Sequence, residues 1–93
     1  MQTVNWLNWH NEVMFTHHYR ERYYERVFKI QIPEQYMFEY VDTKIIKSME
    51  KHFSIKFLNQ MVKCYCDKEC IFAYSDQLYI VFKNRKFITI RPN

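Results

Sequence analysis

A histidine and two arginines recur at four-residue intervals in the segment HYRERYYER, as His18, Arg22 and Arg26. On a helix, residues spaced in this way lie one turn apart and share a face. Arginine offers planar, charged donors that match phosphate oxygens, and histidine titrates near neutral pH, so it can transfer a proton. Attack of a ribose 2′-hydroxyl on its phosphate needs an acid, a base and nearby positive charge, but no metal. The trio therefore fits metal-independent cleavage of RNA.

The same segment has a simpler interpretation. Glu21 and Glu25 alternate with the arginines, and such runs often form exposed ion pairs that stabilise a helix by about 0.2–0.5 kcal/mol each. A solvated, charged helix face is the usual outcome of this pattern. The local pattern leaves both interpretations open.

A helix must position these side chains. Thr16 is suited to cap a helix that runs to about Phe28. Tyr19, Tyr23 and Val27 recur every four residues along it, which predicts a buried stripe. The histidine–arginine face lies beside this stripe, so we expect it at the margin of the core, held by packing yet open to water.

A second group of cations lies near the end of the chain, in YIVFKNRKFITIR. Cations can bind phosphates while aromatic rings stack on bases, so the segment predicts an RNA-binding patch. An edge hairpin that lysines protect from aggregation is the alternative. The cations are Lys83, Arg85, Lys86 and Arg91, and the interleaved rings are Tyr79, Phe82 and Phe87.

Three cysteines, Cys64, Cys66 and Cys70, follow His52 in the sequence. Zinc could take three thiolates and an imidazole, but paired zinc cysteines usually have two to four residues between them, and here one gap is a single residue. Free thiols that pack as small hydrophobic groups are favoured, and a Cys64–Cys70 bridge would need oxidising conditions. We therefore expect no metal and no cofactor.

The chain divides into a helical first half and a strand-rich second half. Residues 3–13 predict a short helix, with Trp6 and Trp9 in a core or dimer contact. Asp42 and Thr43 are candidate caps for a helix over KIIKSMEKHF. Four segments rich in aromatic and β-branched residues then predict strands separated by short polar breaks. These segments are KFLNQMVKCYC, CIFAY, LYIVFK and KFITIRP.

The fold class predicted from this order is α+β, with two or three N-terminal helices followed by a four-stranded antiparallel meander. The 93 residues are expected to form a single domain, 1–93. Glycine is absent, so turns that need positive φ must use Asn, Asp or less suitable residues.

Composition narrows the class of protein. With 48% hydrophobic and 19% aromatic residues, the chain is too apolar to be disordered. A formal net charge of +4 favours polyanionic partners. No run approaches the roughly 18 apolar residues of a membrane span, and the start does not read as a secretory signal. We expect a cytoplasmic protein without a membrane partner, and the residue mixture is typical of an AT-rich genome such as that of a phage.

The segment FTHHYRERYYER resembles the first long helix in one branch of the small ribonuclease-toxin group, which unites RelE-like, colicin D-like and barnase-like enzymes. That branch follows the pattern F-T-x-H-x-x-E-R-x-x-E-R and ends in a strand of the form apolar-Thr-apolar, which FITIRP matches through Thr89. The branch usually has glycine where Val27 stands, and the middle of this chain has no counterpart in the group. The resemblance implies helices followed by a four-stranded antiparallel sheet.

The resemblance also implies roles for individual residues. His18 would transfer the proton, with His17 as its substitute. Arg22 and Arg26 would hold the phosphate, and Thr89 would orient a phosphate oxygen or water from the neighbouring strand. For Thr89, a plain structural role in a strand is the alternative.

These observations predict a small metal-independent endoribonuclease-like protein that cleaves or binds RNA. It would be a toxin or a phage host-takeover factor acting in a bacterial host, with a host protein or an antitoxin as a further partner. The alternative is a non-catalytic phage or mobile-element protein that inhibits a host enzyme or defence complex by direct binding. The short, glycine-free, aromatic-rich chain and the lack of a complete acid–base pair support that alternative.

Overall fold

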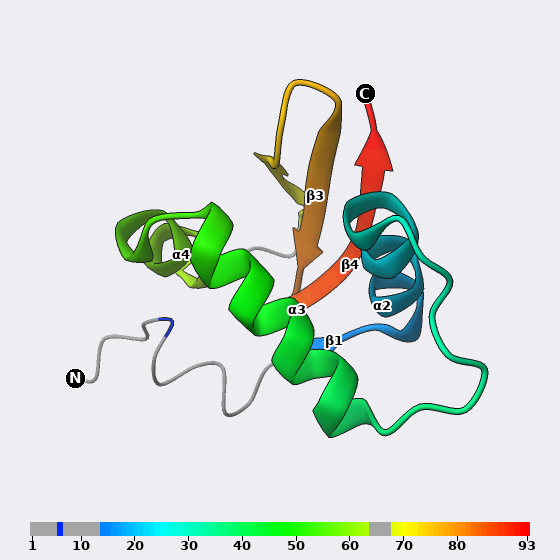
Figure 1. Ribbon diagram of the computed structural model, residues 1–93. Helices are drawn as coiled ribbons and strands as arrows, with labels where there is room; N and C mark the ends of the chain where they lie inside the picture. Colours follow the sequence, from blue (N-terminus) through cyan, green and yellow to red (C-terminus); the bar gives the residue numbers. More distant parts are fainter. Residues whose placement is uncertain (1–5, 7–13, 64–67) are drawn as a thin grey trace.

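The protein is an α+β structure in which three helices precede three antiparallel strands (Figure 1). The computed structural model describes residues 6, 14–63 and 68–93. The first helix begins as α2 (His17–Tyr23) and continues without a break as a π-helical turn, η2 (Tyr24–Phe28). The other helices are α3 (Phe38–His52) and α4 (Ile55–Val62).

The sheet has four strands in the order β1-β4-β3-β2. The strands are β1 (Met14–Phe15), β2 (Cys70–Ala73), β3 (Leu78–Lys83) and β4 (Lys86–Pro92). β2, β3 and β4 pair antiparallel, whereas the two-residue β1 pairs parallel to the start of β4. Because β1 is so short, most of that edge of β4 is left to another element, and α2 lies beside it (Figure 1).

The core lies between one face of the sheet and the helices. The Phe87 ring on β4 is its centre, with ring centroids 5.2 Å from Tyr19, 5.4 Å from Phe15 and 4.9 Å from Phe82. Tyr19 and Tyr23 are fully buried, and Val27 packs partly buried against the same cluster, so the predicted aromatic stripe is confirmed. α3 and α4 contribute the fully buried side chains Val41, Ile45, Met49, Met61 and Val62.

Both ends of the first helix match the prediction. The Thr16 hydroxyl accepts a hydrogen bond from the Tyr19 amide at 3.0 Å, so Thr16 is the N-cap. The helix ends at Phe28, because Lys29 adopts a left-handed conformation with φ of 62°. In a chain without glycine, a lysine takes the position that glycine usually fills.

The segment KFLNQMVKCYC was predicted to be a strand, and that prediction is wrong over most of its length. Its residues up to Val62 belong to α4, where the Ser54 hydroxyl accepts from the Phe57 amide at 3.1 Å as an N-cap. Leu58, Met61 and Val62 follow helical spacing and are buried. The predicted four-stranded antiparallel meander is therefore a three-stranded one, and the fourth strand, β1, comes from the N-terminal side and runs parallel to β4.

The caps predicted for the following helix are also corrected. α3 begins at Phe38 rather than after Asp42 and Thr43, which both lie inside it. The Asp42 carboxylate instead binds Arg20 of α2, with Nε–Oδ1 at 2.7 Å and Nη2–Oδ2 at 3.0 Å. The Arg20 guanidinium also lies 4.4 Å from the centre of the Phe38 ring. This bidentate pair holds α2 against α3.

The predicted helix over 3–13 lies outside the described residues, apart from Trp6. Trp6 is fully buried, as a core contact requires. Its indole nitrogen donates to Glu50 at 3.1 Å, and its amide donates to the Asn59 side chain at 2.7 Å. No helix among the described residues has the length and apolar content that a membrane crossing requires.

We predict that Phe87→Ala lowers the free energy of unfolding by about 3–5 kcal/mol, because it removes the ring on which α2 and β3 meet. Urea denaturation followed by circular dichroism measures this loss. Ile71→Ala is the matched control on the same sheet, since Ile71 is 62% exposed and its truncation should change stability by less than about 0.5 kcal/mol. Equal losses for the two variants would contradict this account of the core.

Candidate nucleic-acid interface

The last hairpin carries a net charge equal to that of the whole chain. The protein has fourteen Lys and Arg against ten Asp and Glu, which gives the net charge of +4. Residues 78–93 contain four Lys or Arg and no acidic residue, and residues 43–63, with five Lys and one Glu, carry the same net charge. The hairpin is therefore one of two cationic segments that attract a polyanion, and the one without an acid of its own.

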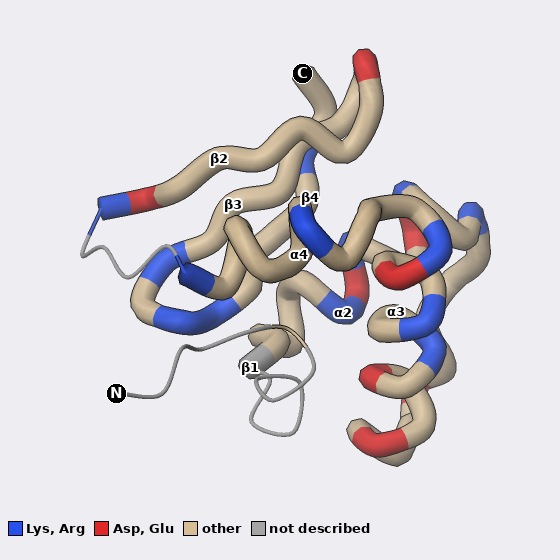
Figure 2. Tube along the Cα trace, turned by 90° about the vertical axis from the view of Figure 1, so that its left-hand side faces the viewer, with Lys and Arg blue, Asp and Glu red and all other residues tan. Residues whose placement is uncertain are grey.

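A tight turn gathers three of these cations. β3 and β4 are joined by Asn84 and Arg85, which have φ of 53° and 63°, as a two-residue type I′ hairpin requires. The turn pairs Lys83 with Lys86 across the two strands. Figure 2 shows Lys and Arg segments around this turn with no acidic segment between them.

The strand register assigns the remaining cation to the sheet face that points away from the helices. Ile80 and Ile90 are paired and belong to the core, so their neighbours Val81 and Thr89 project to the opposite, outer face, where both are nevertheless buried, at 4% and 3% exposed. Continuing the alternation adds Tyr79 and its partner Arg91, which is exposed. One hairpin thus carries all four predicted RNA-binding residues. Lys83, Lys86 and Arg91 lie on its outer face or rim, and Arg85 lies in the turn.

The aromatic part of the predicted patch is corrected. Phe82 and Phe87 have no exposed surface and pack in the core, so neither can stack on a base. Tyr79 is half-buried on the outer face, beside Arg91. Of the three rings proposed for stacking, Tyr79 alone is placed to reach a base.

Pairing of the strands adds one cation that the sequence pattern did not show. β2 pairs with β3 so that Cys70 lies opposite Phe82. The exposed Lys68, two residues before Cys70, therefore lies at the same end of the sheet as the β3–β4 turn. It is accompanied by one acid, Glu69. The sequence gave no signal for this neighbour, since it depends on which strands pair.

The first helix lies along the free edge of β4, which brings the two ends of the chain together. The Thr16 amide donates to the Phe87 carbonyl at 3.1 Å, and the Thr16 hydroxyl donates to the Ile88 carbonyl at 2.8 Å. Further along, Nη1 of Arg26 donates to the carbonyl of Ile90. These bonds satisfy backbone acceptors on an edge that no long strand covers.

The four predicted catalytic residues are only partly gathered. Arg26 reaches the carbonyl of Ile90, the residue next to Thr89. Arg22 is half-exposed and pairs with Glu25, with Nη1–Oε2 at 2.8 Å. His18 is exposed, and no hydrogen bond or ion pair among the described residues joins it to either arginine or to Thr89.

His17 is engaged by neighbouring side chains, and Thr89 is buried. Nδ1 of His17 shares a hydrogen bond with the Tyr36 hydroxyl, and its Nε2 lies 3.1 Å from Glu21. Thr89 is 3% exposed, and its hydroxyl has no hydrogen-bond partner among the described residues. In this arrangement the Thr89 hydroxyl cannot reach a phosphate, whereas His18 is open to one.

The residues considered for zinc do not form a cluster in the part of the chain that the structure describes, where no group of three potential ligands occurs. Cys70 is disulfide-bonded rather than a free thiol, which corrects the expectation for this residue. Cys64 and Cys66 lie outside the described residues. His52 stacks on Tyr74 with ring centroids 3.8 Å apart, and its Nε2 is hydrogen-bonded to the Tyr74 carbonyl.

No family model matches the chain, and neither the curated proteins nor the solved structures contain a match.

We predict that Thr89→Val leaves the protein as stable as the wild type or raises its free energy of unfolding by about 1 kcal/mol, because the buried hydroxyl has no described partner. Urea denaturation provides the measurement. Thr16→Val is the matched control, since it removes a cap with two hydrogen bonds and should cost about 1 kcal/mol. A clear loss for Thr89→Val would show that its hydroxyl is satisfied and structural.

Proposed function

We propose that this protein binds RNA along the outer face and turn of the β3–β4 hairpin. The observation that carries the proposal is the group of four Lys and Arg in residues 78–93 with no acidic residue among them. Phosphate contacts from Lys and Arg supply most of the affinity of proteins for nucleic acid. The hairpin offers such contacts on a surface where the strand register also exposes an aromatic ring, Tyr79.

The spacing of the cations suits an extended strand. Lys86 and Arg91 are five residues apart on β4, which corresponds to about 16 Å along a β-strand. Arg26 extends the track, because its guanidinium is fixed at Ile90, next to Arg91. A row of cations of this length follows a polynucleotide backbone better than it encloses a small anion.

We predict that Lys83→Gln combined with Lys86→Gln weakens binding to single-stranded RNA about tenfold at moderate salt. The slope of log K against log salt concentration should fall by about 1.4, since each lost phosphate contact on a single strand removes about 0.7. Fluorescence anisotropy with a labelled RNA measures both quantities. The comparison with single-stranded DNA of the same sequence is part of the experiment, and tighter binding of the DNA would contradict the assignment to RNA.

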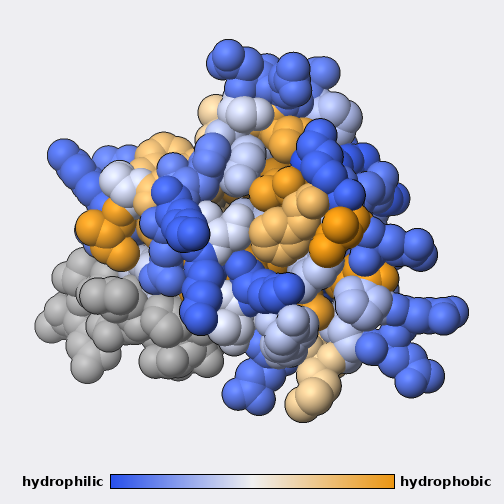
Figure 3. Space-filling view, viewed as in Figure 1, coloured by the Kyte–Doolittle hydropathy of each residue, from blue (hydrophilic) through white to orange (hydrophobic). Residues whose placement is uncertain are grey.

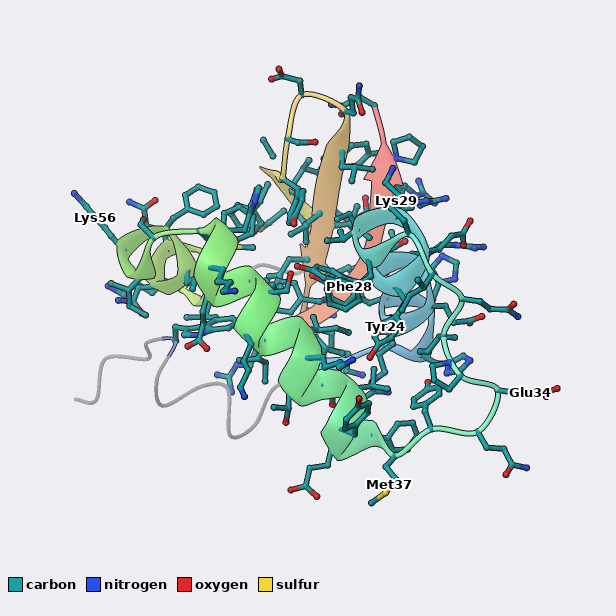
Figure 4. All side chains as sticks on the ribbon, in the orientation of Figure 1. Tyr24, Phe28, Lys29, Glu34, Met37 and Lys56 are labelled. Carbon is teal, nitrogen blue, oxygen red and sulfur yellow. The ribbon has the colours of Figure 1, made fainter. Side chains whose placement is uncertain are left out.

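The matched control is Lys51→Gln combined with Lys56→Gln. Both residues are exposed, and Figure 4 places Lys56 on α4, away from the hairpin. The control removes the same charge from the chain, so a purely global charge effect would weaken RNA binding equally in both variants. That result would remove the reason for placing the interface on the hairpin.

Metal-independent endoribonuclease activity is a second candidate, favoured by the alignment of α2 along β4. This packing brings the helix and strand that carry the two resembling segments side by side. His18 is the accessible group for proton transfer, and Arg22 and Arg26 are the cations nearest to it on the helix face. A role for Thr89 would need its hydroxyl to become accessible. A toxin or a phage host-takeover factor would use such an activity against the RNA of its host.

For this candidate we predict cleavage of RNA by the wild type in the presence of EDTA, and a loss of rate of about 10²–10⁴-fold in His18→Ala, as expected for removal of a general acid or base. His17→Ala is the control and should retain the rate, because His17 is engaged with Tyr36 and Glu21. Gel analysis of labelled RNA gives both rates. Intact RNA after incubation with folded wild-type protein would exclude the activity while leaving RNA binding to be judged by anisotropy.

A further inference from the structure

An apolar groove lies between η2 and α3, on the helix side of the molecule. Phe28, Ile30, Lys44 and Lys47 line a hollow of about 260 Å³. Figure 3 shows hydrophobic surface between α3 and the first helix, bordered by hydrophilic side chains. The hollow is large enough for a bulky apolar side chain from another molecule.

Exposed hydrophobic side chains are concentrated between the end of the first helix and the first turn of α3, and one of them, Ile30, lines this groove. Among the described residues six large hydrophobic side chains are exposed, and four of them lie between residues 30 and 40. Met37 is 73% exposed and Tyr40 57%, and together with Thr43 they line a second hollow on the other side of Lys44 and Lys47. A grouping of this kind on a small protein marks an interaction surface, because scattered single residues are the ordinary case.

Lysines predominate on one rim of the groove and acids on the other. On the α3 side stand Lys44 and Lys47, and the Lys44 ammonium lies 5.1 Å from the centre of the Tyr40 ring. Lysine stems of this kind cover apolar surface while their charges stay in water. Glu39, in the first turn of α3, is the acid on that side. On the α2 side, beyond Ile30, lie Lys29 and the acids Glu21 and Glu25.

A buried hydroxyl lies beneath the groove. The Tyr24 ring packs edge-on against Phe28, with centroids 4.9 Å apart, and Figure 4 shows both side chains in the layer between the first helix and α3. Tyr24 is 2% exposed, and its hydroxyl has no hydrogen-bond partner among the described residues. Burial raises the pKa of Tyr24, so the hydroxyl stays protonated and can donate.

We propose that this groove docks an acidic amphipathic helix of a partner protein. Apolar residues at helical spacing would fill the hollow over Phe28 and Ile30, as in other helix-in-groove interfaces. Carboxylates on the flank of that helix would pair with Lys44 and Lys47. The partner helix lies with its acidic flank on the α3 side, because Glu21 and Glu25 stand on the other.

Charge complementarity favours an acidic helix over two other occupants, a second copy of the chain and RNA. A second copy of this face would offer acids that are already engaged within each chain, Glu25 with Arg22 and Glu21 with His17, and so fewer carboxylates for Lys44 and Lys47 than an acidic helix. RNA would meet an apolar hollow with carboxylates on one side of it. The docking proposal is independent of RNA binding, since the groove lies on the helix side and the cationic hairpin points its outer face the other way.

Peptide selection tests the proposal. Random linear peptides displayed on phage are selected on the wild-type protein and, in parallel, on the double variant Lys44→Glu and Lys47→Glu. Peptides enriched on the wild type should be acidic, with apolar residues three or four apart. When the protein is titrated with synthetic versions of these peptides, the largest changes in backbone NMR chemical shift should occur at Phe28, Ile30 and Lys44. The double variant should bind these peptides at least about tenfold more weakly, because opposite charges become like charges.

Two further variants separate docking from folding. Ile30→Ser changes a residue that is 54% exposed, so it should keep the thermal midpoint yet weaken peptide binding about tenfold. Lys56→Glu with Lys63→Glu makes the same charge change at exposed positions on α4 and its C-cap, away from the groove, and should leave peptide binding unchanged.

Several results would overturn the proposal. These are no enrichment, enrichment of neutral or basic peptides, or peptide-induced shifts outside η2 and α3. Sedimentation showing a dimer that Ile30→Ser dissociates would assign the groove to a second copy instead. Loss of RNA affinity in Lys44→Glu with Lys47→Glu that matches the loss in the hairpin variant would assign it to RNA.

Discussion

The contact between α2 and β4 is the constraint on which the rest of the structure depends. β4 lies between β3 and an edge that β1 covers for only two residues. The first helix covers the remaining edge, with the Tyr19 ring on Phe87. Thr16 binds the carbonyls of Phe87 and Ile88, and Arg26 binds the carbonyl of Ile90. An edge left open would expose unpaired backbone groups to other chains. By covering this edge, α2 stabilises the three-stranded antiparallel sheet of this 93-residue chain.

The same contact divides the molecule into two surfaces with different chemistry. Helices occupy one face of the sheet, and the pairs Arg20–Asp42 and Tyr23–Ser48 tie α2 to α3 above that face. The hydrogen bond to Asp42 raises the pKa of Arg20, so the guanidinium stays charged. The opposite, outer face of the sheet is formed by β2, β3 and β4. The four Lys and Arg of β3, β4 and their turn are therefore directed away from the helices.

Charge and apolar surface are therefore separated on this protein. The hairpin is cationic without acids of its own, whereas the groove between η2 and α3 is apolar, with lysines on one rim and glutamates on the other. A polyanion and an acidic helix make different demands, since the first needs long-range attraction and the second needs a hollow that excludes water. The two proposed binding surfaces are separate, so occupation of one would not obstruct the other.

Sequence alone determined the features that depend on near neighbours. Thr16 capping, the buried Tyr19–Tyr23 stripe and the last two strands with their turn all follow from patterns within a few residues, where backbone geometry fixes what lies beside what. Segment 55–62 shows the limit of such reasoning. Its aromatic and β-branched residues favour a strand, but burial of Leu58, Met61 and Val62 on one helical face stabilises the helix instead.

The tertiary structure alone decided what distant segments make together. It placed Arg26 at Ile90, enclosed the Thr89 hydroxyl, turned Phe82 and Phe87 into the core and left the groove beside Phe28 open. Each of these depends on which face of a strand meets which helix. The packing of the whole core determines these orientations, so they cannot be predicted from a short segment of the sequence.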